Sequence, residues 1–196
     1  MLGLAAAALL TALPALADNY LPAWAFGGFV RPEGVNPLIK PRTDTSFPCP
    51  MRGKTVAWEC ADTFNPAAVE KDGKICILYR AEDDPKAGIG GRTSRIGYAE
   101  SADGIHLDYR QATPVFYPDG SDISRTYEWK GGCEDPRVVA ANVKGKTLYV
   151  MTYTAWNNRT PRLAIATSTD LQHWTKHGPA LLNAYNGKFK DLACKS

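Results

Sequence analysis

The segment at residues 131–137 concentrates groups that can move a proton or bind a polar ligand. It reads GGCEDPR, so that two carboxylates, Glu134 and Asp135, and the guanidinium of Arg137 lie beside two glycines. Adjacent charges shift the pKa values of carboxylates, and glycine lets the backbone approach a ligand closely. The segment is therefore a candidate catalytic site. A turn with a surface ion pair is the alternative that these residues leave open.

The elements that would position this segment occur twice along the chain. Each copy has a polar residue before proline, a glycine turn, an alternating apolar stretch and a Ser-x-Asp turn, and corresponding residues include Asn65 and Asp135, Tyr79 and Tyr153, and Arg95 and Arg162. These landmarks separate about four short strands in each copy. A repeated unit of four antiparallel strands predicts β-propeller blades and an all-β fold. The Ser-x-Asp turns are expected to be scaffold, because Asp side chains bond their own backbone in such turns.

The repeat predicts which polar side chains meet. Asn65-Pro66 and Asp135-Pro136 would each precede the innermost strand of a blade, where proline forgoes a hydrogen-bond donor that the strand start does not need. We therefore expect Asn65 and Asp135 to face one channel. Arg80 follows the apolar residues 75–79, where the second copy carries Thr154. Burying a lone charge is costly, so Arg80 is expected to have a partner or a ligand.

Composition excludes several classes of protein. Of the 196 residues, 44% are hydrophobic and 22% are charged, which is typical of a globular chain, and Gly 17 with Pro 14 favours many turns over long helices. The net charge of +3 comes without a cluster of Lys and Arg, so we expect no nucleic-acid partner. Five cysteines without a CxxC pair, and three histidines, do not favour a metal site or a disulfide scaffold. The pairing of the cysteines stays open.

Both ends of the chain carry signals. Residues 1–17 read MLGLAAAALLTALPALA, an apolar run that ends in an A-x-A cleavage pattern and is too short to span a bilayer. We interpret residues 1–17 as a signal peptide and expect an exported protein, periplasmic or secreted, with a partial propeller domain at 18–196. Two blades cannot close a ring. We therefore expect a fragment whose remaining blades follow Ser196, and assembly of blades between chains is the alternative.

Several motifs in this order resemble one enzyme family. The motifs are DTFNPA at 62–67, LYRAED at 78–83, SRIGYA at 94–99, GCEDPR at 132–137 and RLAIATSTDLQHWTKHGP at 162–179. Together they resemble glycoside hydrolase family 130, and the likeness extends from Trp24 to Ser196. FPCPMR at 47–52 and FKDLACKS at 189–196 resemble the β-1,2-mannosidase group of that family more than its phosphorylases.

The resemblance implies a five-bladed β-propeller that cleaves β-mannosides with inversion. It implies that Asp135 is the catalytic acid, acting through a sugar hydroxyl, and that Asn65 and Arg80 bind mannose in the −1 subsite. Glu82, Arg95 and Arg137 lie in matching motifs and are further substrate-binding candidates. It implies a manno-oligosaccharide substrate, no metal and no cofactor, with inorganic phosphate as co-substrate in a phosphorylase.

Three functions stay open. The first is an inverting β-mannosidase, and the second is a mannoside phosphorylase of the same fold; the third is a sugar-binding module without catalysis. The base or phosphate site that separates the first two is expected beyond Ser196, and the isolated fragment is expected to be inactive. Trp129 and Trp156 lie near the channel motifs, where they either stack on a sugar or pack against the protein.

Overall fold

The computed structural model describes residues 22, 24–26, 28, 30–88 and 90–196. The chain divides into two compact units, Met1–Glu33 and Gly34–Ser196, and every strand among the described residues belongs to the second. The signal-peptide prediction for residues 1–17 lies outside the described residues. Among the residues that are described, no helix is long and apolar enough to cross a membrane.

The first repeat forms a four-stranded antiparallel sheet, which we call blade 1. Its strands, in order from the inner edge, are β3 (Asp62–Lys71), β4 (Lys74–Glu82), β5 (Ser94–Ser101) and β6 (Tyr109–Arg110). Gly73, with a φ of 74°, makes the tight turn between the first two strands. Small φ-positive turns of this kind join neighbouring antiparallel strands with few residues.

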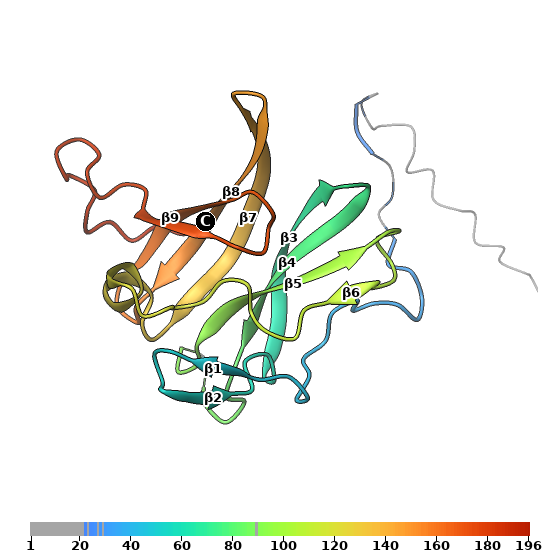
Figure 1. Cartoon of the computed structure of the whole chain (residues 1–196), viewed down its shortest axis with the longest axis horizontal. Helices are drawn as coiled ribbons and strands as arrows, with labels where there is room; N and C mark the ends of the chain where they lie inside the picture. The colour runs from blue at the N-terminus through green and yellow to red at the C-terminus, as the bar shows by residue number, and fades with distance from the viewer. Residues whose placement is uncertain (1–21, 23, 27, 29, 89) are drawn as a thin grey trace, which may run out of the picture. The chain divides into compact units, whose positions relative to one another are not determined.

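The second repeat forms blade 2 with the same strand order. Its strands are β7 (Gly132–Val143), β8 (Lys146–Trp156), β9 (Pro161–Ser168) and β10 (Thr175–Pro179). Figure 1 shows the two sheets as separate fans whose inner strands β3 and β7 lie side by side. The predicted all-β repeat of four-stranded units is confirmed. Residues 180–196 contain no strand.

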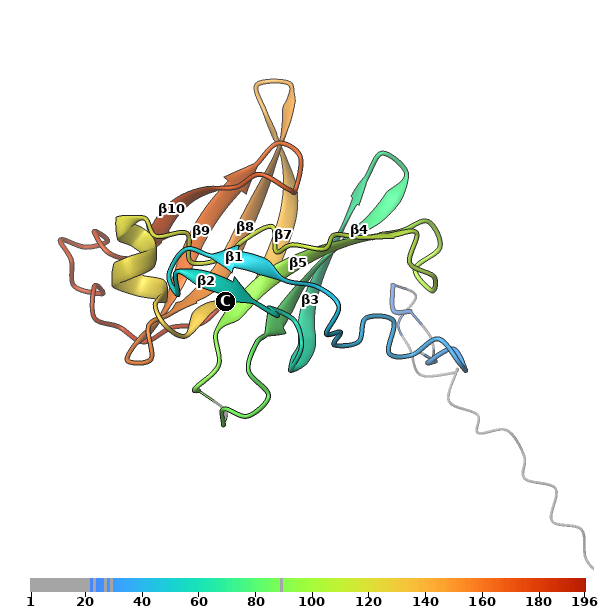
Figure 2. The ribbon, with the colours of Figure 1, turned by 60° about the horizontal axis from the view of Figure 1, so that its bottom comes forward.

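Apolar side chains fill two cores. One lies between the blades and contains Leu78, Tyr98, Phe116, Met151 and Tyr153 among others. The other lies between blade 1 and the hairpin of β1 (Phe47–Cys49) and β2 (Lys54–Val56), which Figure 2 shows along the side of that blade. A short π-helix, η1 (Ser124–Glu128), lies on the connection between the blades. All five cysteines are described, and all are free thiols.

The two Ser-x-Asp turns are scaffold, as predicted. In the first, Oδ1 of Asp103 accepts hydrogen bonds from the backbone N–H groups two and three residues on, and Oδ2 lies 2.7 Å from Nδ1 of His106. Asp170 and His173 repeat the arrangement with the same 2.7 Å contact. The two histidines are exposed turn residues remote from the inner strands. These hydrogen bonds hold the pKa values of both aspartates well below the usual range.

The prolines of the two inner strands lie differently from the prediction. Pro66 and Pro136 lie within β3 and β7, not ahead of them. Each lies in a β-bulge, where the register shifts between Phe64 and Ala67 in one strand and between Glu134 and Arg137 in the other. A bulge leaves a residue unpaired, so the missing N–H of proline costs the sheet nothing.

Candidate active site

The two bulges bring Asn65 and Asp135 together. Both residues have left-handed backbone conformations, with φ values of 45° and 50°. Asparagine and aspartate adopt this conformation more readily than most residues, which fits their place in a bulge that re-aims a side chain. Nδ2 of Asn65 donates a hydrogen bond to Oδ1 of Asp135 over 2.8 Å. The predicted meeting of the two side chains, from inner strands of neighbouring blades, is confirmed.

Arg80 of β4 has the partners that its position predicted. Its Nη1 donates to Oδ1 of Asp135 at 3.0 Å, and its Nη2 donates to Glu82 at 2.7 Å and to Glu134 at 2.8 Å. The guanidinium lies over the ring of Phe64, 4.5 Å from its centre. One largely buried cation thus binds three carboxylates from both blades. Charge-assisted bonds of this kind fix side chains more firmly than neutral ones.

The last residues of the sequence reach the same carboxylates. Nζ of Lys195 lies 3.2 Å from Oε2 of Glu134 and 3.4 Å from Oδ2 of Asp135. Oγ of Ser196 donates to the backbone oxygen of Asp135 at 2.6 Å, and its N–H donates to Oγ1 of Thr154 at 3.1 Å. The segment after β10 therefore places a second cation beside Asp135, opposite to Arg80.

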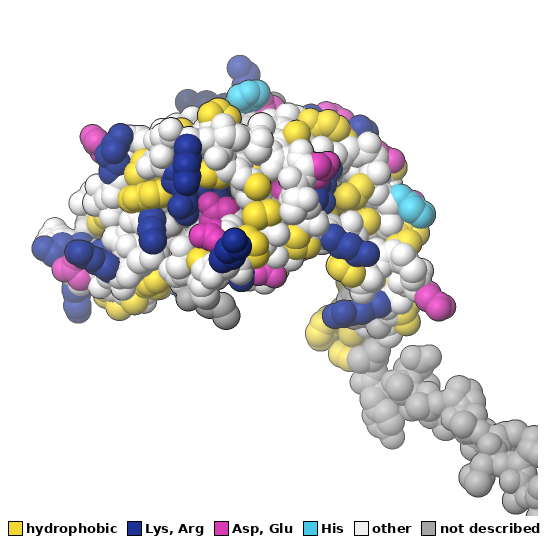
Figure 3. All heavy atoms as spheres, turned by 90° about the horizontal axis from the view of Figure 1, so that it is seen from below, with side chains coloured by type: hydrophobic (Ala, Val, Ile, Leu, Met, Phe, Trp, Pro, Cys, Tyr) yellow, Lys and Arg dark blue, Asp and Glu magenta, His cyan; other side chains and the backbone are white. Residues whose placement is uncertain are grey.

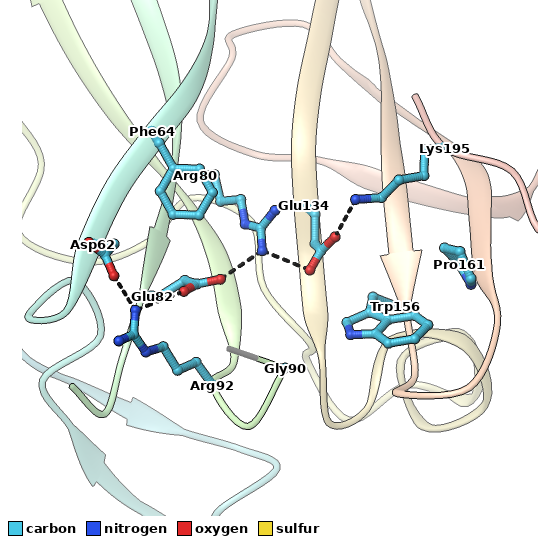
Figure 4. Close-up of a pocket in the computed structure, with 10 residues that line it drawn as sticks. All are labelled: Asp62, Phe64, Arg80, Glu82, Gly90, Arg92, Glu134, Trp156, Pro161 and Lys195. Carbon is cyan, nitrogen blue, oxygen red and sulfur yellow. Dashed lines mark hydrogen bonds and ion pairs between the residues drawn. The ribbon is translucent and has the colours of Figure 1, made fainter. Parts of the chain in front are cut away.

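A cavity of about 590 Å³ opens beside this cluster (Figure 4). Its lining residues come from both blades, from the loop before β5 and from the C-terminal segment: Asp62, Phe64, Arg80, Glu82, Gly90, Arg92, Glu134, Trp156, Pro161 and Lys195. Figure 4 shows Asp62, Glu82 and Arg92 on one side, and Trp156 and Pro161 on the other. Arg92 forms ion pairs with Asp62 and Glu82. A cavity with charged groups and an aromatic side chain fits a small polar ligand such as a sugar.

Glu134 and Asp135 are neighbours whose pKa values move in opposite directions. Burial is the largest influence on both and raises them. At Asp135 the hydrogen bonds from Asn65 and Arg80 and the positive charges of Arg80 and Lys195 outweigh burial, so the net pKa is lowered. At Glu134 burial prevails, and the net pKa is raised. Two carboxylates with diverging pKa values are a usual feature of acid–base sites.

Of the predicted site residues, Arg80 and Glu82 line the cavity, whereas Asn65, Arg95, Arg137 and the predicted acid Asp135 do not. Asp135 contacts the lining residues Arg80 and Lys195, but Arg95 and Arg137 lie apart from this cluster. Arg95 is fully buried, and its Nη1 donates to Oδ2 of Asp83 at 3.0 Å and to the backbone oxygen of Thr93 at 3.1 Å. It holds the start of β5 against the β1–β2 hairpin, where its guanidinium lies over Phe47. Arg137 follows the bulge and therefore points to a separate, mostly apolar cavity between β3, β7 and β8. Glu82 lines the main cavity, as the motifs suggested.

Sequence reasoning left out other lining residues. Glu134 was recognised as a carboxylate of the 131–137 segment but was given no role of its own. Phe64 lies within the DTFNPA motif, and its position beside Asn65 was the available signal. Arg92 and Lys195 come from segments without regular structure, whose paths the repeat does not describe. Of the two tryptophans singled out, Trp156 lines the cavity, and Trp129 lies against Arg52, 5.7 Å from its guanidinium.

The cluster does not have the make-up of a metal site. Among the described residues no group of three or more His, Cys, Asp or Glu side chains is placed to bind a metal ion. The carboxylates at the cavity are instead paired with Arg80, Arg92 and Lys195. Basic and acidic side chains are also interspersed on the face drawn in Figure 3.

Two glycines allow the blades to meet at this site. The only pairing between the blades among the described residues is parallel and joins Ser94 of β5 to Gly132 of β7. A Cβ on Gly132 would lie 2.1 Å from the backbone oxygen of Ser94, and the φ of Gly132 is 107°. The N–H of Ser94 donates to the oxygen of Gly131 at 2.8 Å. The glycines noted in the sequence therefore serve contact between backbones.

Comparison with known proteins agrees with this architecture. The model of glycoside hydrolase family 130, described as beta-1,4-mannooligosaccharide phosphorylase, matches residues 36–194. A 1,2-beta-oligomannan phosphorylase from Thermoanaerobacter sp. (strain X514) is 35% identical over 148 residues, which are 74% of this chain and 46% of that protein.

Solved structures resemble the chain more closely. One, from work reporting that the GH130 family of mannoside phosphorylases contains glycoside hydrolases that target beta-1,2 mannosidic linkages in Candida mannan, is 62% identical with a TM-score of 0.83. A glycosyl hydrolase from Bacteroides ovatus is 57% identical, also with a TM-score of 0.83. Each match covers 91% of this chain and 48% of the other. The chain thus spans about half the length of these relatives, and with its paired four-stranded blades it belongs to glycoside hydrolase family 130.

Proposed function

We propose that the protein is an inverting glycoside hydrolase that cleaves β-mannosides, with β-1,2-linked manno-oligosaccharides as substrate. The geometry of Asp135 carries the proposal. This carboxylate lies in a bulge of an inner strand, is fixed by Asn65 and Arg80, and adjoins a cavity large enough for a sugar. The identity of 62% to a structure from the work on β-1,2-mannosidic linkages supports the choice of substrate.

In this mechanism Asp135 is the general acid. Its lowered pKa keeps it ionised in the free site, so it must gain a proton when substrate binds. Burial already opposes ionisation of this carboxyl, and a sugar that displaces the remaining water strengthens that effect. Asp135 then passes its proton to the leaving oxygen through a hydroxyl of the bound mannose, while Asn65 and Arg80 hold the sugar. An inverting enzyme also needs a base on the opposite face. We assign that base to a part of the propeller outside this sequence.

Phosphorolysis is the second candidate. Two comparisons favour it: the matching family model is described as a phosphorylase, and the relative from Thermoanaerobacter sp. is a 1,2-beta-oligomannan phosphorylase. Phosphorylases of this family use inorganic phosphate as co-substrate and need no cofactor. The two candidates differ in the nucleophile that attacks the sugar: water in hydrolysis, and inorganic phosphate in phosphorolysis.

Product analysis tests the proposal. We expect the full-length protein to release free mannose from β-1,2-mannobiose at the same rate with and without phosphate. A requirement for phosphate, with mannose 1-phosphate as product, would identify a phosphorylase instead. The Asp135→Asn variant should lower kcat about 10²- to 10⁴-fold, the usual contribution of a general acid, while titration calorimetry still detects substrate binding. If the variant keeps its turnover, Asp135 is not the acid; if wild-type protein binds without turnover, the protein is a binding module.

We further propose that residues 1–17 direct export to the periplasm or the medium. The A-x-A pattern before Asp18 supports this proposal. N-terminal sequencing of the exported protein should begin at Asp18, and a mature protein that retains residues 1–17 would contradict it.

A further inference from the structure

Trp156 and Glu82 occupy equivalent places in the two blades. Glu82 ends β4 opposite Asp62, and Trp156 ends β8 opposite Gly132. Both side chains line the 590 Å³ cavity, one from each blade (Figure 4). The repeat therefore gives blade 2 an indole where blade 1 has a carboxylate. This asymmetry places an indole on the blade 2 side of the cavity, at the position where blade 1 places the carboxylate of Glu82.

The position of Trp156 along β8 sets its distance from the cleavage site. Thr154, two residues earlier, pairs with Glu134, which adjoins Asp135. Side chains two residues apart lie on the same face of a strand, about 7 Å from each other. Trp156 is therefore displaced from the carboxylates by about the length of one sugar ring. That offset fits the sugar next to the one that Asn65 and Arg80 would hold.

The indole is held in place by its neighbours. A Cβ on Gly131 would lie 1.9 Å from Cδ1 of Trp156, so the ring packs directly against the backbone at Gly131. The same Cβ would lie 2.6 Å from Oδ1 of Asn158, whose Nδ2 donates to the backbone oxygen of Gly90 at 3.0 Å. This bond ties the turn after β8 to the loop of blade 1 across the cavity. A ring that is fixed in advance binds a ligand at a smaller entropic cost.

The indole N–H of Trp156 is also unused. In the described part of the chain it donates to no protein group, whereas Nε1 of Trp58 donates to Ala112 and Nε1 of Trp174 donates to Leu171, each at 2.9 Å. Trp156 is half-buried, as is Trp129, whose N–H also has no acceptor among the described residues, so this N–H stays accessible from the cavity that Trp156 lines. Here the partner can be a ligand hydroxyl in the cavity.

We propose that Trp156 is the platform on which the leaving-group sugar stacks, in the subsite directly beyond the cleaved bond. This inference rests on the proposed function. The aromatic face covers the C–H face of the pyranose, and Nε1–H donates to one of its hydroxyls. Arg92, paired with Asp62 and Glu82, offers polar groups to the opposite edge of the same sugar. The subsite would make Trp156 a determinant of which leaving group is accepted.

Two substrates with different leaving groups test this proposal in the full-length protein. β-1,2-Mannobiose places a sugar on Trp156, whereas β-mannosyl fluoride fills only the −1 subsite. For Trp156→Ala we expect kcat/KM to fall about 10- to 100-fold on mannobiose, from loss of the stacked aromatic surface, and to change less than about threefold on the fluoride. Trp156→Phe, which keeps an aromatic face, should recover most of the loss. Trp129→Ala removes an indole outside the cavity and should leave both values unchanged.

The outcomes are distinct. If Trp156→Ala loses kcat/KM equally on both substrates, or loses none on mannobiose, Trp156 does not form this subsite. The proposed function still holds in that case, provided that the wild-type protein is active. Each assay is run with and without phosphate, so the test also works for a phosphorylase. If wild-type protein turns over neither substrate, the proposed function itself fails, and the subsite fails with it.

Discussion

Glu134 and Asp135 are adjacent in sequence, yet folding shifts their pKa values in opposite directions. Asp135 shares Arg80, Lys195 and Asn65, which favour its ionised form, whereas burial of Glu134 favours its neutral form. For a carboxyl whose pKa is lowered by folding, the stabilisation is present above the unfolded pKa and is lost as the pH falls through the folded pKa. For a carboxyl whose pKa is raised, ionisation costs stability once the pH exceeds the unfolded pKa.

This contrast predicts opposite pH dependences for two isosteric variants. Asp135→Asn should lower Tm more at pH 7 than at pH 3, because the stabilisation from the lowered pKa is fully present above the unfolded pKa and is partly lost by pH 3. Glu134→Gln should be better tolerated at pH 7 than at pH 3, because it removes a costly ionisation. Thermal unfolding followed by circular dichroism at both pH values measures the differences. The same pH trend in both variants would contradict the assignment of the two environments.

Residue types alone indicated part of this site. Arg80 after an apolar run predicted a charged partner, and Asn65 and Asp135 were predicted to meet because their prolines recur. Arg95 shows why the rest could not be predicted: its motif resembles a binding motif, but the hairpin that covers it comes from residues 47–56. Arg80 lines the cavity, whereas Arg95 is buried under this hairpin. The difference depends on packing between segments distant in sequence, and the spacing of the motifs does not predict it.

At the scale of elements, the junction between β5 and β7 controls whether the two halves of the site meet. Asn65, Arg80 and Glu82 come from blade 1, and Glu134 and Asp135 come from blade 2. Their hydrogen bonds span that junction, where Gly132 lies against Ser94. A displacement of the blades would separate Arg80 from Asp135.

We therefore predict that Gly132→Ala destabilises the protein by roughly 2–4 kcal/mol, because the added Cβ meets the backbone oxygen of Ser94 in a strained backbone conformation. Gly145→Ala is the matched control. Gly145 also has a positive φ, of 79°, but nothing lies within 4 Å of its Cβ, so the cost should be about 1 kcal/mol. Urea unfolding measures both. Equal costs would show that the junction tolerates movement.

The repeat made the blades predictable, because each strand shows its own alternation of apolar and polar residues and each turn contains its own Asp or Gly. It gave no information on the bulges. A bulge is visible only as a one-residue shift in the pairing of two strands, and the sequence of one strand does not state its register with the next. The path of residues 180–196 was also not predictable, since it follows contacts with Pro161, Thr154 and Asp135 and no period of its own.

On the scale of the whole molecule, a buried ionic cluster joins the segment before β3 to blade 1. Glu59 is fully buried and accepts hydrogen bonds from Arg42 and Thr45 at 2.7 Å and from Tyr79 at 2.8 Å, and it pairs with Arg110. Burial, followed by the charge of Glu59, raises the pKa of Tyr79 and keeps its hydroxyl available as a donor. Residues 42–59 are thereby anchored to β4 and β6.

Glu59→Ala should cost about 3–5 kcal/mol of stability, because it leaves buried cations and hydroxyls without their acceptor. Lys74→Ala is the comparison. It breaks the exposed ion pair with Glu100 and should cost less than about 1 kcal/mol. Chemical denaturation compares the two. A small effect of Glu59→Ala would mean that the apolar contacts of Phe47 and Trp58 suffice to hold the segment.

The proline that follows Asn65 has a consequence for the lifetime of the protein. Asparagine side chains age by deamidation, in which the backbone nitrogen of the next residue loses its hydrogen and closes a succinimide ring. Pro66 carries no hydrogen on that nitrogen, so this route is closed at Asn65. Conversion of Asn65 to aspartate would set a second carboxylate 2.8 Å from Asp135 and replace a donor with a repelling charge. The residue that shapes the bulge thus also protects the amide chemically.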